Sequence, residues 1–129
     1  MKNTLILAIC IFILTGCASV GQVASSGEEH IGPYPENWRT IVRNYIKSSY
    51  VDPYSVRDSE AAAPFRNKAL FFDSWDICIR NNAKNRMGGY TGLTTSVISV
   101  QKGEVVAVDN SDFHCRGRNL KWESLPLPN

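Results

Sequence analysis

Apolar and polar residues alternate with a helical period between residues 35 and 50. Five apolar side chains recur three or four positions apart and so share one face of a helix: Trp38, Ile41, Val42, Tyr45 and Ile46. Pro35 suits the first turn of a helix, whereas Pro53 disfavours helical geometry at the residue before it. The pattern predicts one amphipathic helix that begins near Pro35 and ends near Tyr50.

A row of cations lies on another face of this predicted helix, because Arg39, Arg43 and Lys47 are four positions apart. Such a row is compatible with contact to anionic lipid or lipopolysaccharide. A solvated helix face is the commoner explanation of the same spacing, and we favour it.

The pattern changes to that of β-strands beyond residue 69. Before this point we expect a turn or short helix from Asp52 to Arg57 and a weakly structured connection over residues 61–64. Gln101-Lys102-Gly103 separates two β-branched runs and predicts a hairpin turn. Five segments have strand-like patterns: 69–72, 75–80, 94–100, 104–108 and 113–115.

These elements predict an α+β fold over residues 35–118. The N-terminal amphipathic helix is expected to pack on a small antiparallel sheet of three to five strands. The polar stretch 119–129 contains Pro126 and Pro128, and we expect it to be a flexible C-terminal tail.

The first 17 residues follow the pattern of a bacterial lipoprotein signal. Lys2 precedes an unbroken apolar run from Leu5 to Leu14, which is shorter than the roughly 20 residues that span a bilayer. The next residues complete Leu14-Thr15-Gly16-Cys17, which resembles a lipobox. We therefore expect residues 1–16 to be removed as a signal peptide and Cys17 to carry acyl chains, such as palmitate, that hold it in a membrane. The alternative is an ordinary secretory signal with a coincidental cysteine.

The residues after Cys17 indicate the compartment. Ala18 is not the Asp that resembles the inner-membrane retention signal of Gram-negative bacteria, so we expect the outer membrane, with the protein facing the periplasm. Residues 17–34 are interpreted as the lipidated cysteine and a flexible tether, because they are mostly small and polar. Loss of Lys2 lowers the formal net charge from +2 to about +1, which gives no electrostatic case for binding nucleic acid.

The chain contains four cysteines, and two of them remain after processing. Cys10 leaves with the signal peptide and Cys17 is consumed by lipid. Because the periplasm is oxidising, we expect Cys78 and Cys115 to form a disulfide. The alternative makes Cys78 a nucleophile with His114 as its base.

Two segments together resemble an uncharacterised family of small bacterial lipoproteins and secreted proteins. The first is Asp52-Pro53-Tyr54-Ser55-Val56-Arg57, a D-P-x-S pattern. The second runs from Cys78 to Gly92 and has the form C-x3-N-A-K-N-x2-G-G-Y-x-G. The likeness covers roughly residues 35–115, which is most of the mature domain. It implies the fold and the compartment only, since the family has no established activity, and it assigns no catalytic residue.

The glycine-rich part of the second segment is the candidate binding loop. Its glycines permit a sharp turn, its amides and cations offer polar contacts, and we expect the ring of Tyr90 at the loop tip, suited to a glycan, a peptide or a partner protein. No G-K-[ST] follows the glycines, so a nucleotide-phosphate loop is disfavoured. The alternative is a structural β-connection whose asparagines bond local backbone. The candidate residues are Asn82, Lys84, Asn85, Arg86, Gly88, Gly89, Tyr90 and Gly92.

Other chemistry finds little support in the sequence. Two histidines without a free thiol make a poor metal set, so we expect no metal and no cofactor. Asp73 and Asp76 are interpreted as a turn residue and the exposed side of a strand, and an enzyme that uses them or His114 is only a reserve hypothesis. We expect a lipid-anchored envelope protein that acts by binding, as an accessory component of an envelope assembly. The alternative is a peptidoglycan-binding module or an inhibitor of an envelope hydrolase.

Overall fold

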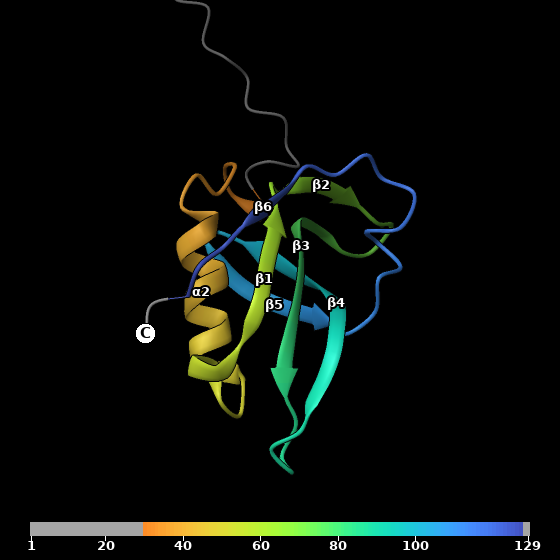
Figure 1. Ribbon diagram of the computed structural model, residues 1–129. Helices are drawn as coiled ribbons and strands as arrows, with labels where there is room; N and C mark the ends of the chain where they lie inside the picture. Colours follow the sequence, from red (N-terminus) through yellow and green to blue (C-terminus); the bar gives the residue numbers. More distant parts are fainter. Residues whose placement is uncertain (1–29, 128–129) are drawn as a thin grey trace, which may run out of the picture.

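The computed structural model describes residues 30–127 and contains a helix followed by a six-stranded antiparallel sheet (Figure 1). This confirms the α+β prediction, although the sheet has one strand more than the upper expected number. Helix α2 spans Trp38–Ser49, close to the predicted bounds, and a 3₁₀ helix, η1, covers Pro53–Ser55. The strands are β1 (Arg57–Ala62), β2 (Phe65–Lys68), β3 (Asp73–Lys84), β4 (Tyr90–Gln101), β5 (Glu104–Asp109) and β6 (Trp122–Ser124).

Strand β3 organises the sheet, whose order is β5-β4-β3-β1-β6. On one side β3 pairs with β4 along nearly its whole length. On its other side the first part pairs with β2 and the later part with β1. Because β3 has 12 residues, it connects structures at two distant ends of the domain.

Helix α2 covers one face of the sheet, as the apolar stripe predicts. Its residues Trp38, Ile41, Val42 and Ile46 are buried. They pack with side chains that alternate along the strands and belong to one core: Ala61, Ile77, Ile79, Ile98, Val100 and Leu125. Burial of this face supplies most of the hydrophobic stabilisation of the domain.

The opposite face of the sheet is covered by the segment between β5 and β6. A disulfide joins Cys78 in β3 to Cys115 in this segment, which confirms the predicted pair and rules out Cys78 as a free nucleophile. The strand expected at 113–115 is wrong, because the Cys115 N–H donates to the Asp112 carbonyl in a turn. The disulfide and the contact of His114 with Asp76, not strand pairing, hold this segment on the sheet.

Two further local predictions are corrected. Residues 61–64 are not a loose connection, since Ala61 and Ala62 are buried at the end of β1. The apolar run 69–72 is not a strand but the turn between β2 and β3, with Lys68 paired to Asp73. The side chains of this run are apolar, but they are exposed and not buried.

The ordered domain is longer at both ends than the sequence indicates. Ile31, assigned to the tether, is fully buried. In the expected C-terminal tail, β6 pairs with β1 and Leu125 is 1% exposed. A bidentate ion pair between Arg39 and Glu123, with an N–O distance of 2.8 Å, also holds β6 against α2. Pairing with distant parts of the chain therefore holds β6 in place, although its own sequence has no strong strand pattern.

The signal peptide, Cys17 and the first part of the tether lie outside the described residues. Among residues 30–127, no helix is long and apolar enough to cross a membrane.

Candidate functional site

The candidate binding loop is the tip of the β3–β4 hairpin, which extends beyond the end of α2 (Figure 1). The side-chain oxygen of Asn85 accepts hydrogen bonds from the N–H groups of Met87 and Gly89, at 2.9 and 3.1 Å. Gly88 has a φ of +82°, which favours glycine. Asn85, Gly88 and Gly89 therefore shape the turn, as the structural alternative proposed.

The stem of the hairpin is held in the same way. The Asn82 side-chain oxygen accepts a hydrogen bond from the Gly92 N–H at 3.0 Å. The strand register shifts between Asn82 and Lys84, and Gly92 has a φ of +85°. These residues form a bulge that bends the hairpin, so the Asn82 side-chain oxygen is already bonded within the hairpin.

Tyr90 does not lie at the loop tip, contrary to the sequence-based expectation. Its hydroxyl donates to the Ser55 carbonyl at 3.0 Å, and the Arg57 guanidinium lies 4.2 Å from its ring centroid. Tyr90 begins β4 and contacts the segment that contains η1. It braces the stem, a role that depends on a segment 35 residues away.

The two motif segments of the sequence thus form one structural unit. The Lys84 ammonium lies 3.3 Å from the Asp52 carboxylate, in addition to the contact of Tyr90 with Ser55. The Ser55 hydroxyl and then the Lys84 ammonium lower the pKa of Asp52 from its ordinary value. The D-P-x-S turn serves as a support for the glycine-rich hairpin.

The groups left for recognition are at the tip and along the outer side of β4. Arg86 is exposed, and Met87 is 94% exposed. Leu93 is 57% exposed. The sequence analysis included Arg86 but missed Met87 and Leu93. The sequence feature that could have identified these two residues is an apolar side chain within a polar, glycine-rich loop.

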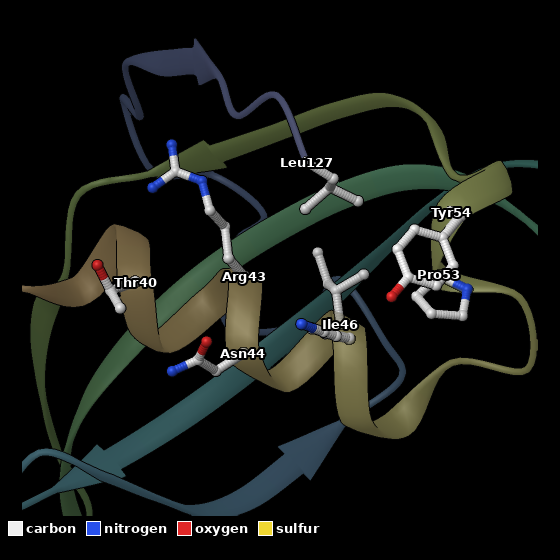
Figure 2. A pocket seen from close by; sticks show the side chains of 8 residues that line it. Thr40, Arg43, Asn44, Ile46, Pro53, Tyr54 and Leu127 are labelled. Atoms are coloured by element: carbon white, nitrogen blue, oxygen red, sulfur yellow. The ribbon is translucent and has the colours of Figure 1, made fainter. Parts of the chain in front are cut away.

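A small apolar pocket lies between α2, η1 and the C-terminal segment (Figure 2). Ile46 and Leu127 face one another across it, and Pro53 and Tyr54 lie at one end (Figure 2). Its volume of about 140 Å³ is below the range typical of cofactor sites.

The predicted cation row contributes partly to this pocket. Arg43 and Lys47 line it. The Arg43 guanidinium also donates to the Pro126 carbonyl at 3.2 Å. Because Arg39 is paired with Glu123, the row is not a uniform solvated face, and two of its members hold the C-terminal segment.

A polar groove of about 480 Å³ separates the end of α2 from the hairpin stem. Tyr45 and Tyr50 line it and pack edge to face at a centroid distance of 6.0 Å. Burial, with a smaller contribution from Tyr50, raises the pKa of the Tyr45 hydroxyl above its ordinary value. Val51, Ala83 and Lys84 also line the groove. The rest of the lining carries hydroxyls and amides: Ser49, Asn81, Thr91, Thr94, Thr95, Ser96 and Asn110.

Asp76 is fully buried, so its predicted place on the exposed side of a strand is wrong. It faces the covered side of the sheet and accepts hydrogen bonds of 2.7–2.8 Å from the side chains of Ser74, Ser99 and Asn67. The His114 Nδ1 lies 2.9 Å from the same carboxylate.

This Asp76 cluster joins β2, β3, β4 and the segment after β5. Asp73 stands apart from it, in an ion pair with Arg66. The two nearby hydroxyls donate to Asp76 and not to His114, so the cluster contains no serine–histidine pair of the kind that activates a serine nucleophile. No group of three possible metal ligands occurs in residues 30–127.

Comparison with known proteins does not assign this chain to a family. No protein-family model matches the chain, and no curated protein or solved structure is significantly similar to it. The resemblance to the small-lipoprotein family therefore stays a prediction from the two motif segments.

Proposed function

We propose that this protein is a lipid-anchored component of the cell envelope that binds a protein partner through the tip of the β3–β4 hairpin. The anchor is Cys17, the compartment is the periplasmic side of the outer membrane, and the protein is an accessory subunit of a larger assembly. The observation that carries the proposal is a braced, projecting hairpin that exposes 94% of Met87.

The geometry of the hairpin suits recognition of a protein. Contacts of Lys84 and Tyr90 with the segment around η1 fix the stem, so little conformational entropy is lost when the tip binds. Met87 is apolar and adaptable, and Arg86 beside it is of a type enriched in interfaces. The tip thus combines an apolar anchor with a cation on a rigid support.

In-cell photo-crosslinking tests this assignment. A photoreactive residue at Met87 is expected to give one dominant protein adduct, whereas the same residue at Asn119, which is exposed on the segment after β5, is expected to give none. Mass spectrometry of the adduct identifies the partner. Equal labelling from both positions, or no adduct from Met87, contradicts the proposal.

The polar groove supports the second candidate, a peptidoglycan-binding module or an inhibitor of an envelope hydrolase. Tyrosine rings with surrounding hydroxyls and amides are suited to a glycan. If this function holds, Tyr45→Phe lowers cosedimentation with purified peptidoglycan while Tyr34→Phe, outside the groove, does not. Equal retention of the two variants, or no retention of the wild type, contradicts it.

A further inference from the structure

The turn between β2 and β3 exposes three consecutive apolar side chains. Leu70 is 89% exposed, Phe71 94% and Phe72 39%. The Ala69 N–H donates to the Phe72 carbonyl at 3.2 Å, which closes a tight turn with Leu70 and Phe71 at its tip. Such turns usually contain Gly, Asn or Asp. Packing within the domain does not account for the apolar residues here, and clustered exposed apolar side chains are typical of contact surfaces.

This apolar turn, residues 70–72, lies where the chain from Cys17 enters the domain. His30 lines the same surface hollow as the three turn residues. The fully buried Ile31 fixes that entry point, because its carbonyl also accepts a hydrogen bond from the Lys102 N–H at 2.6 Å. The Gly32 carbonyl accepts a further one from the Trp75 indole at 3.1 Å.

The distance along the chain keeps the apolar turn close to the expected anchor. Cys17 and His30 are separated by the 12 residues 18–29. Even a fully extended chain of this length spans only about 45 Å. A lipid on Cys17 therefore holds the entry point, and the apolar turn beside it, within reach of the membrane surface.

The hairpin tip lies at the other end of the molecule. The apolar turn precedes β3 and the hairpin tip follows it, and β3 has 12 residues. At the usual rise per residue, β3 separates the two by roughly 40 Å. Figure 1 shows β2 at one end of the sheet and the β3–β4 tip at the opposite end.

The charges around the apolar turn suit a phospholipid surface. Lys68 and Lys102 are exposed, and neither forms an ion pair within residues 30–127. The neighbouring carboxylate, Asp73, is paired with Arg66 at 3.0 Å. Cations beside an apolar tip are attracted to anionic headgroups.

We infer that Leu70, Phe71 and Phe72 insert into the phospholipid surface next to the lipidated Cys17, as a second membrane contact. Leu and Phe partition favourably into the headgroup boundary. A lipid on a tether leaves the domain free to rotate, whereas a second contact at the entry point orients it. The β3–β4 tip then points away from the membrane. This inference rests on the lipid anchor in the proposed function.

Tryptophan quenching in vesicles tests the second contact. The mature protein, with the signal peptide removed and Cys17 lipidated, is reconstituted in vesicles of phosphatidylethanolamine and phosphatidylglycerol. These vesicles include phospholipids brominated near the headgroup. Phe71→Trp and Met87→Trp form a matched pair, since each replaced side chain is 94% exposed. We expect quenching of the added emission by about twofold or more for Phe71→Trp. Quenching of Met87→Trp is expected to stay at the wild-type level.

The outcomes separate this inference from the proposed function. If the protein does not float with the vesicles, the anchor is wrong and the second contact is wrong with it. If the protein floats but Phe71→Trp is not quenched, the anchor stands and only the second contact is overturned. Equal quenching of both variants overturns the orientation. Unchanged melting temperatures of the two variants exclude misfolding as the cause of any of these results.

Discussion

At the scale of single residues, the buried Asp76 carboxylate is the most consequential polar group of the fold. Three side-chain donors and His114 converge on it. Asp76→Ala leaves the buried hydroxyls of Ser74 and Ser99 without their acceptor, and we expect a loss of about 3 kcal/mol in the free energy of unfolding. Thermal denaturation checks this, with an expected decrease of at least about 10 °C in the melting temperature.

Asp112→Ala is the matched control for this variant. Asp112 pairs with Arg116 on the surface, where the two side chains are 47% and 75% exposed. Exposed ion pairs contribute little to stability, so we expect a change below about 1 kcal/mol. Similar melting temperatures for the two variants would show that the Asp76 cluster does not hold the segment after β5.

Asp52 links stability to pH at the base of the hairpin. Its pKa is lowered in the folded protein by the Ser55 hydroxyl and the Lys84 ammonium. A lowered pKa stabilises the fold above the ordinary value of 3.8, and this stabilisation is lost as the pH falls through the folded pKa. We therefore expect Asp52→Asn to melt below the wild type at neutral pH, and this gap to narrow on acidification below about 3.8. Melting temperatures of both proteins measured across this pH range test the prediction. A difference in melting temperature that does not change with pH contradicts the role given to Asp52.

At the scale of elements, the C-terminal segment contributes a side chain to the hydrophobic core. Leu125 is 1% exposed and packs with α2 and the sheet, directly after β6. Leu125→Ala is expected to cost about 3 kcal/mol through lost burial and a residual cavity. Leu70→Ala makes the same chemical change at an 89% exposed position, and we expect it to alter stability by less than about 0.5 kcal/mol. Denaturant unfolding of both variants measures the difference, and equal losses would refute the burial argument.

The elements also show which parts of the fold the local sequence pattern predicts. Helix α2 and the β4–β5 hairpin follow from periodicity and turn residues close together in the chain. Strand β6 does not, because its three residues are stabilised by pairing with β1 and by the contact of Glu123 with Arg39. The apolar turn after β2 misled the strand prediction, since an exposed apolar run and a buried one have the same composition.

At the scale of the whole molecule, we propose that a lipid on Cys17 sets where the protein acts. Cys17→Ser removes the proposed lipid-attachment site, and we expect the variant to leave the membrane fraction or to remain unprocessed. Cell fractionation and the apparent mass of the protein check this outcome. A variant that is processed and stays with membranes like the wild type would refute the anchor.

The candidate site was only partly predictable from the sequence. The glycines were assigned to a sharp turn, and the turn is there. Asn85 was a candidate binding residue, whereas its side-chain oxygen accepts backbone hydrogen bonds within the turn, as the structural alternative proposed. The expected display of Tyr90 at the tip is wrong, because its ring packs on a segment that only the fold brings near. Met87 was missed, since exposure of a single side chain depends on what the rest of the chain covers.

The sequence by itself determined the amphipathic helix, the strand-rich second half and the choice of Cys78 and Cys115 as the disulfide pair. These properties follow from spacing along the chain and from the count of cysteines left after the expected processing. Only the tertiary structure decided the burial of Asp76, the bracing role of Tyr90 and the exposure of the apolar turn. Each of these depends on contacts between distant segments, which strand order and register set and local pattern does not encode.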